Sequence, residues 1–212
     1  RQPCVDDDTG DDDTGDDDDT EPRHYNAGMG FGGILQVEID EEVSRVSRQY
    51  LGDLNGGALD DPRVDLVFED AMKYVAAPGP KFDVILSDTS DPIGPAEVLF
   101  QKSFHQAVFD RLNDQGIFVC QSESPYYNED SIRKIYKSLR SVFPVVHMYL
   151  AHIPMYPGGT WAFAYCSKGL HPVTDFDPAR VAAAGFEMRY YNADLHRGAF
   201  ALPTFAKEMS QA

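Results

Sequence analysis

A short apolar run that opens into a polar loop constrains this chain more than any other stretch. The run covers residues 82–86 and is followed by SDTSDPIGPAE, residues 87–97. This pattern indicates a buried parallel strand that ends in a loop. Ligands of open α/β sheets bind beyond the carboxyl ends of the strands, so Asp88 and Asp91 are candidate site residues. Each also has a plainer interpretation, because Asp88 can close the strand and Asp91 can cap the turn before Pro92.

Apolar runs alternate with helical patterns along the rest of the chain. Further strands are predicted within residues 34–40, 61–68, 116–121, 145–153 and 161–166. Helices are predicted over residues 41–50, 71–75, 97–112 and 128–142, after Asp177 and near 203–209, with an N-terminal cap at Asn128. The alternation predicts an α/β fold built on a Rossmann-like, mainly parallel, doubly wound sheet.

An acidic block lies near the start of the chain. Residues 6–19 read DDDTGDDDTGDDDD and include no apolar residue. Charge repulsion and the lack of anything to bury predict a disordered tail over residues 1–25, ahead of one folded domain over residues 26–212. A calcium loop is the alternative, because aspartates offer oxygen ligands, but the block lacks the spacing and the terminal Glu of an EF-hand loop.

The charge balance argues against nucleic acid as a partner. The formal net charge is −17 at pH 7, whereas phosphate binding needs clustered lysines and arginines. An acidic protein is compatible with small cationic ligands. No apolar run is long enough to cross a membrane, and the N-terminus lacks the pattern of a signal peptide.

The cysteines indicate a reducing compartment. Cys4, Cys120 and Cys166 are widely spaced and odd in number, which predicts buried thiols in the cytoplasm and not a disulfide or zinc framework. No metal is expected, because no His/Cys spacing suits one, and no Ser/His/Asp pattern suggests an acyl transferase. Packing or surface positions are expected for three histidines, His105, His147 and His152.

Three further side chains have both a functional and a structural interpretation. Glu38 ends a predicted strand, where an acid can accept hydrogen bonds from ribose hydroxyls, but it can equally favour the N-terminus of the next helix. Tyr156, which lies between two prolines, can contact a substrate or simply pack in its loop. Trp161 begins an apolar strand and is more commonly a core residue than a substrate wall.

Five motifs in series carry a resemblance to a known family. They are VEIDEEV, EDAMKYV, FDVILSDTSDPIGPAEVLF, PMYPGGTWAF and YYNADLHRGAFALPTFAKE. From about Ile34 to the C-terminus, the chain resembles the polyamine aminopropyltransferases, most closely the spermidine synthases. The resemblance implies aminopropyl transfer from decarboxylated S-adenosylmethionine to putrescine, giving spermidine and methylthioadenosine, with no other cofactor. It also suggests a homodimer.

The resemblance implies roles for the side chains around the amine. Asp88 would be the base that accepts the amine's proton. Asp91 would bind the amine from the other side, and Tyr156 would hydrogen-bond the same substrate. Gln121 and Glu123, which follow the next strand, would bind the far ammonium group. These assignments suit a substrate that is dicationic in solution.

The resemblance also implies a binding site for the co-substrate. Glu38 would accept hydrogen bonds from the ribose hydroxyls. Asp70 and the backbone of Ala71 would bind the adenine amino group.

The N-terminal part departs from the family pattern. Family members have a small β-stranded domain, then a first sheet strand, a GGGDGG loop and a helix before the ribose-binding acid. This chain has GMGFGG, with Phe31 at the position of the loop acid, and only Ile34 to Val37 before Glu38. That connection is too short for a parallel crossover, so the first βα unit is predicted to be missing. Its neighbours in the sheet must then close the gap or leave unpaired edges.

These departures support an alternative function. A non-catalytic remnant of the family that binds a nucleoside or a polyamine would keep the motifs without the missing unit. A generic S-adenosylmethionine methyltransferase would share the sheet and the ribose acid, but it would explain neither SDTSDP nor PMYPGG.

Overall fold

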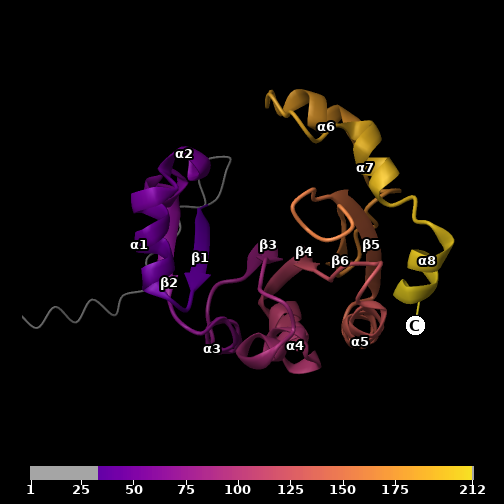
Figure 1. Ribbon diagram of the computed structural model, residues 1–212, viewed down its shortest axis with the longest axis horizontal. Coiled ribbons are helices and arrows are strands. Elements are labelled where there is room, and N and C mark those ends of the chain that lie inside the picture. Colours follow the sequence, from indigo (N-terminus) through magenta and orange to yellow (C-terminus); the bar gives the residue numbers. More distant parts are fainter. Residues whose placement is uncertain (1–32, 212) are drawn as a thin grey trace, which may run out of the picture.

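The computed structural model describes residues 33–211 (Figure 1). The predictions for the acidic tail and for residues 26–32, together with Cys4 and Phe31, lie outside these residues. Strands and helices alternate through the described part, which confirms the α/β class. None of its helices is long and apolar enough to cross a membrane.

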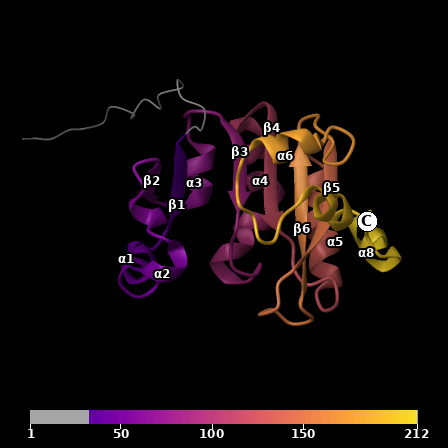
Figure 2. The ribbon, with the colours of Figure 1, turned by 90° about the horizontal axis from the view of Figure 1, so that it is seen from above.

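The strands form two separate sheets and not one. The first, the two-stranded sheet, pairs β1 (Ile34–Glu38) with β2 (Val64–Phe68) in parallel. The second, the four-stranded sheet, has the order β3-β4-β6-β5, with bounds Phe82–Ser87, Leu112–Gln121, Thr160–Ser167 and Val145–His152. Figures 1 and 2 both show β1 and β3 apart, with no described strand between them. Within residues 33–211, β1 and β3 therefore each pair on one side only.

The four-stranded sheet is mixed. β3 and β4 are parallel, whereas β6 runs antiparallel to both β4 and β5. The cause is local, because residues 153–159 join β5 and β6 as a hairpin loop, which reverses the chain without a crossover helix. The α/β prediction is confirmed, with parallel pairing confined to β1–β2 and β3–β4.

The hydrophobic core belongs to the four-stranded sheet. The helices α4 (Lys102–Arg111) and α5 (Glu129–Arg140) pack on one face of this sheet, and α8 (Thr204–Ser210) packs against α5 and β5. Fully buried side chains from both helices and the sheet interlock there, among them Val108, Ile132, Tyr136, Leu139 and Phe118. Between residues 33 and 81, by contrast, only Ser44 and Val75 are buried.

The helices of the first half cover the two-stranded sheet only partly. They are α1 (Glu41–Tyr50), the short α2 (Gly52–Asn55) and α3 (Ala71–Ala76), with a 3₁₀ turn at Ala58–Asp60. The α2 helix and the 3₁₀ turn were not predicted, since they occupy a glycine-rich stretch in which Gly56 and Gly57 have positive φ angles.

The predicted helix over residues 97–112 is divided in two. A 3₁₀ helix covers Gly94–Phe100, and α4 begins at Lys102 after an extended Gln101 (φ −88°, ψ 158°). This break lets Phe100 and Phe104 both enter the core. At its other end α4 stops at Arg111, and β4 begins at Leu112, earlier than predicted.

The helix ends differ from the sequence expectation in two places. Asn128 is the N-cap residue of α5, as predicted, but its side chain makes no capping hydrogen bond. The helix α7 (Ala193–Ala199) was not predicted, although it has a clear cap, because Asn192 Oδ1 accepts hydrogen bonds from two backbone N–H groups. A further helix, α6 (Pro178–Ala183), follows Asp177 as predicted.

Two of the predicted buried thiols are confirmed. Cys120 and Cys166 are free cysteines on β4 and β6, both buried. Burial raises the pKa of the Cys120 thiol to about 12, so it stays protonated at neutral pH.

Candidate active site

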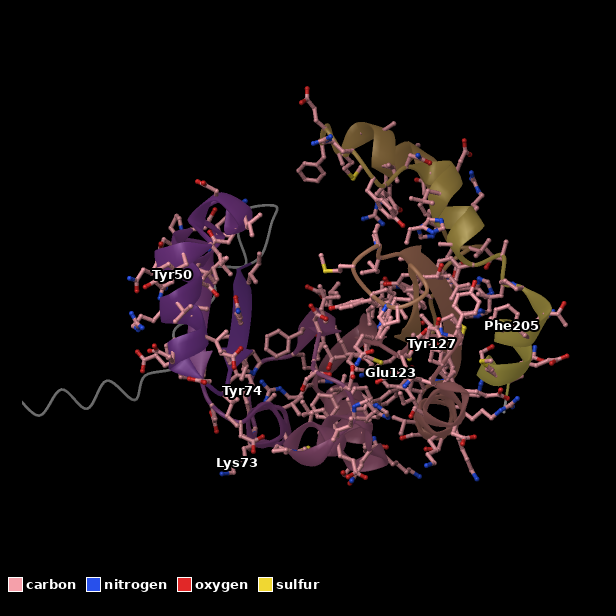
Figure 3. The ribbon with its side chains drawn as sticks, viewed as in Figure 1. Tyr50, Lys73, Tyr74, Glu123, Tyr127 and Phe205 are labelled. Carbon is pink, nitrogen blue, oxygen red and sulfur yellow. The ribbon has the colours of Figure 1, made fainter. Side chains whose placement is uncertain are left out.

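A cavity of about 530 Å³ lies beyond the carboxyl ends of β3 and β4. Its walls come from the β3 loop, the segment after β4, the hairpin loop and β6. The lining residues are Asp88, Thr89, Ser90, Asp91, Gln121, Glu123, Ser124, Tyr127, Asn128, Tyr156, Pro157, Trp161 and Phe163. Glu123 and Tyr127 are labelled in Figure 3. All five side chains expected around the amine therefore line one cavity.

The β3 loop contributes Asp88 and Asp91. β3 ends at Ser87, and the chain continues through Pro92 to Gly94. Gly94 is the first residue of the 3₁₀ helix and has a φ of +61°. This turn keeps both carboxylates at the strand end, where they are exposed to solvent. They can thus meet a cation that enters from water without first being desolvated.

Glu123 is a buried carboxylate in a strained backbone conformation. Its side chain is 1% exposed, and Oε1 has no hydrogen-bond partner in the described residues. Burial and, secondarily, the charge of Asp91 raise the pKa of Glu123 to about 7. Its φ of +76° is the one left-handed value among the described non-glycine residues, a conformation that costs about 1 kcal/mol or more. A buried acid that lacks a partner and faces a cavity is suited to bind a cationic group.

Two contacts hold Glu123 in this conformation. Its backbone N–H donates to Gln121 Oε1 (2.9 Å), and its carbonyl accepts a hydrogen bond from the N–H of Ala162 on β6 (3.0 Å). β6 thus fixes the position of the acid through the backbone.

Gln121 connects three walls of the cavity. Its Oε1 also accepts a hydrogen bond from Trp161 Nε1 (3.1 Å), while its Nε2 donates to the carbonyl of Thr89 (3.4 Å). The amide therefore joins the β3 loop, Glu123 and β6. Because both the oxygen and the nitrogen of the amide are already hydrogen-bonded to the protein, Gln121 acts by positioning Glu123, Trp161 and the β3 loop.

The hairpin loop supplies an aromatic wall. Tyr156 stands 4.7 Å from Trp161, measured between ring centroids, and is half-exposed, whereas Trp161 is 8% exposed. Gly158 permits this loop, because its φ is +81° and a Cβ there would lie 2.9 Å from Cδ2 of Tyr126. Trp161 is therefore both a buried residue, as the sequence favoured, and part of the cavity wall.

The residues expected to bind the co-substrate lie elsewhere. Glu38 ends β1, where its Oε1 accepts a hydrogen bond from the N–H of Asp40 (3.0 Å). Asp70 caps α3 by accepting hydrogen bonds from Met72 N and Lys73 N, and Ala71 begins that helix. None of the three lines the cavity. The structure thus brings together the residues expected around the amine, but leaves those expected to bind the co-substrate at the end of β1 and the start of α3, outside this cavity.

Sequence reasoning missed several lining residues. Tyr127, Ser124 and Asn128 follow β4, and Phe163 lies within β6. The signal available for the first group was the polar and aromatic stretch SESPYYN directly after a strand end. Phe163 carried no such signal, because a phenylalanine inside a strand is usually a core residue.

The three histidines take packing or surface positions, as expected. His105 is fully buried next to Phe104 and Phe118, and burial lowers its pKa to about 4. His147 is half-buried and His152 is exposed. Among residues 33–211, no group of three or more His, Cys, Asp or Glu side chains could hold a metal ion.

Known proteins resemble this chain over most of its length. The family model described as "Spermine/spermidine synthase domain" matches residues 29–178. A polyamine aminopropyltransferase of Caldicellulosiruptor saccharolyticus is 42% identical over an alignment of 195 residues, which covers 86% of this chain and 69% of the relative. The corresponding protein of Clostridium perfringens strain 13 is 45% identical over 178 residues, covering 83% of this chain and 62% of the relative.

Solved structures agree with the sequence relatives. Spermidine synthase from Thermotoga maritima superposes with a TM-score of 0.78 and 35% identity, covering 84% of this chain and 60% of that one. A spermidine synthase in complex with the transition-state analogue AdoDATO gives a TM-score of 0.80 at 36% identity, covering 84% and 61%. The chain thus spans about three fifths of the length of the solved structures it matches. From the family model, these identities and the superpositions, we conclude that it belongs to the spermine/spermidine synthase family.

Proposed function

We propose that this chain transfers an aminopropyl group from decarboxylated S-adenosylmethionine to putrescine. The observation that carries the proposal is the convergence of Asp88, Asp91 and Glu123 in one cavity with aromatic walls. Family membership supports the same reaction.

The cavity suits a diamine that is dicationic in solution. Carboxylates within a few ångströms of an ammonium group favour its charged form, and aromatic faces attract cations. Glu123 would bind the far ammonium group of the diamine, since its carboxylate is buried and its Oε1 has no partner within residues 33–211. Tyr156 and Trp161 would flank the alkyl chain.

Asp88 would prepare the attacking amine. An alkylammonium has a pKa near that of lysine, about 10.4, so forming the neutral amine at pH 7 costs on the order of 5 kcal/mol. The nitrogen then attacks the methylene carbon next to the sulfonium. As the carbon–nitrogen bond forms, the carbon–sulfur bond breaks, and its electron pair leaves with sulfur as the neutral thioether methylthioadenosine. Asp88 would accept the proton that the ammonium loses before the attack and pass it to solvent, with Asp91 holding the amine in line, and the product nitrogen remains a secondary ammonium.

The co-substrate would be bound from the two-stranded sheet. Glu38 would accept the ribose hydroxyls, and Asp70 with the backbone of Ala71 would bind adenine. No cofactor beyond the sulfonium co-substrate is proposed. A cytoplasmic location, suggested by the widely spaced cysteines, and a homodimer, suggested by the family resemblance, complete the proposal.

The test is amine-dependent release of methylthioadenosine by the purified chain. Asp88→Asn keeps the shape of the side chain but removes the base, so turnover should fall by about 10²- to 10⁴-fold. Asp114→Asn, on the exposed start of β4, is the matched control and should leave turnover unchanged.

Two results would contradict the proposal. One is full activity in Asp88→Asn. The other is binding of putrescine or methylthioadenosine by a folded protein without any turnover, which would favour the non-catalytic remnant.

A further inference from the structure

The helix α3 is an element that both sheets share. It follows β2 along the chain and leads into β3. It contacts β1 of the two-stranded sheet and α4, which packs on the four-stranded sheet, and Figures 1 and 2 both show it between the two sheets. Its N-terminal end carries Asp70, the cap, and Ala71, which are proposed to bind adenine. The orientation of α3 therefore decides where these two residues lie relative to the cavity.

The C-terminal end of α3 needs hydrogen-bond donors from another element. The last carbonyls of a helix have no partner within the helix. The carbonyl of Tyr74 would accept from the residue four positions on, but that residue is Pro78, which has no N–H. Pro80, two residues further, lacks one as well. The loop after α3 thus offers few N–H groups of its own.

The guanidinium group of Arg111 supplies the donors. Arg111 is the last residue of α4 and is 7% exposed. Its Nη1 donates to the carbonyls of Tyr74 (3.2 Å) and Ala77 (2.6 Å), and its Nε donates to the carbonyl of Pro80 (2.8 Å). The planar fork of arginine suits several acceptors at once. Arg111 therefore binds the end of α3 and the loop after it at three points.

Close packing fixes the guanidinium group in place. Its Cζ lies 5.4 Å from the ring centroids of both Tyr74, which Figure 3 labels, and Phe82, within the range of a cation–π interaction. Gly79 leaves the room that the group needs, because a Cβ there would lie 2.8 Å from Nη2. The backbone of Gly79 has no positive φ, so this close approach is what favours glycine at the position.

Arg111 lies directly before the strand that leads to the cavity. β4 begins at Leu112, which is fully buried, and ends at Gln121, two residues before Glu123. One side chain thus connects the start of this strand to the helix that carries Asp70. A change in Arg111 can alter the orientation of α3 while the core beneath the cavity stays packed.

We propose that Arg111 is a positioning residue, which holds α3 in the orientation that lets one co-substrate reach both the adenine-binding residues and the cavity. The inference rests on the proposed function and adds a residue that touches neither substrate. The methylene carbon must meet the amine while adenine stays bound. A small rotation of α3 should therefore weaken binding of the nucleoside and leave binding of the amine unchanged.

The test compares the wild-type chain with Arg111→Met, which keeps the length of the side chain but removes its donors. Isothermal titration calorimetry measures the affinities for methylthioadenosine and putrescine separately. Arg111→Met should weaken methylthioadenosine binding by about tenfold or more and leave putrescine binding unchanged. Arg111→Lys, which keeps the charge but not the fork, should give an intermediate loss. In turnover assays, the KM for decarboxylated S-adenosylmethionine should rise more than kcat falls.

A control variant separates positioning from stability. Leu139→Ala removes a fully buried side chain of α5 and should lower the free energy of unfolding. It should leave both affinities unchanged, because α3 keeps its hydrogen bonds to Arg111. Circular dichroism at the assay temperature checks that each variant is folded.

Gly79→Ala perturbs the same contact without removing a donor, and it also serves if Arg111→Met does not fold. The new Cβ should displace the guanidinium group and again weaken methylthioadenosine binding selectively. In the double variant with Arg111→Met the two effects should not add, because both act on one contact. Gly169→Ala is the matched control, since a Cβ there meets no atom within 4 Å.

Three results would overturn the inference. They are an unchanged methylthioadenosine affinity in Arg111→Met, equal weakening of both ligands, and equal effects of Gly79→Ala and Gly169→Ala. Failure of the proposed function gives a different result, because methylthioadenosine would then bind, and depend on Arg111, without any turnover. A folded wild-type chain that neither binds methylthioadenosine nor turns over would overturn both.

Discussion

The two sheets of this protein differ in how their parallel strands are supported. The four-stranded sheet has helices packed on it and an interlocked core, with residues such as Leu112, Phe118 and Leu139 almost fully buried. The two-stranded sheet has no buried strand residue. The buried apolar side chains that stabilise the four-stranded sheet are thus nearly absent from the two-stranded sheet.

Ion pairs do not make up for the missing core. Three exposed pairs, Arg45–Glu42, Arg48–Asp60 and Arg63–Asp61, lie on or beside α1 and β2. Exposed pairs of this kind typically contribute 0–1 kcal/mol each, because solvent screens them. The comparison teaches that the cavity rests on the half with the hydrophobic core, whereas the residues proposed to bind the co-substrate lie on the half in which only Ser44 and Val75 are buried.

The largest expected effect is on the core of the four-stranded half. Leu139→Ala on α5 removes a fully buried side chain and should lower the free energy of unfolding by about 3 kcal/mol. Leu35→Ala, on half-buried β1, should cost about 1 kcal/mol because little packing is lost. Denaturant unfolding measures both. Equal losses would show that the two-stranded sheet is packed as tightly as the other.

Loss of the Gln121 amide should have the next largest effect. Gln121→Leu leaves Trp161 Nε1 and the N–H of Glu123 without their acceptor, which should cost about 2 kcal/mol of stability. The turnover number should also fall, because Glu123 and the β3 loop lose their connection. The matched change in the two-stranded sheet is Gln36→Leu, at an exposed position of β1. It should change the free energy of unfolding little. A stable, fully active Gln121→Leu would refute the positioning role.

A pair of glycines separates backbone strain from close packing. Gly158→Ala and Gly57→Ala have similar φ angles, +81° and +74°, but only the first brings a Cβ within 2.9 Å of another side chain. Both should lose about 1 kcal/mol from backbone strain, and Gly158→Ala should lose a further 1 kcal/mol or so from the clash with Tyr126. Thermal unfolding compares them. Equal losses would mean that the hairpin loop packs no more closely than the glycine-rich stretch after α2.

A further prediction concerns pH. The pKa of Glu123 is raised to about 7 in the folded protein, above its ordinary value of 4.5, so between these values the folded state binds more protons than the unfolded state. Stability should therefore fall as pH rises from about 5 to 8. Glu123→Gln cannot titrate and should flatten this dependence, as measured by denaturant unfolding at several pH values. An unchanged slope would show that Glu123 is not protonated in the folded protein at pH 5–6.

Local patterns in the sequence predicted the strands and the meeting of the amine-side residues. Apolar runs located β3 and β4, and because carboxyl ends of adjacent parallel strands meet, Asp88 and Glu123 had to share an edge. The family resemblance, confirmed by the comparisons, added the hairpin loop with Tyr156. These features depend on residues close together in sequence.

Features that depend on distant partners could not be predicted. The role of the Gln121 amide arises from contacts with Thr89 and Trp161, which are 32 and 40 residues away. The left-handed backbone of Glu123 follows from pairing with β6, and nothing in its own sequence signals it. The division of the described strands into two sheets also depends on distant pairing and had no signal within any one strand.

The most direct test of the account is a calorimetric titration of putrescine into the wild-type chain and Glu123→Gln at pH 7, in buffers of different ionisation enthalpy. An ammonium group beside Glu123 lowers its raised pKa, so wild-type binding should release a fraction of a proton. Glu123→Gln should bind more weakly and lose that part of the release. Binding that is equally strong in both proteins, with equal proton release, would contradict the claim that this carboxylate recognises the diamine.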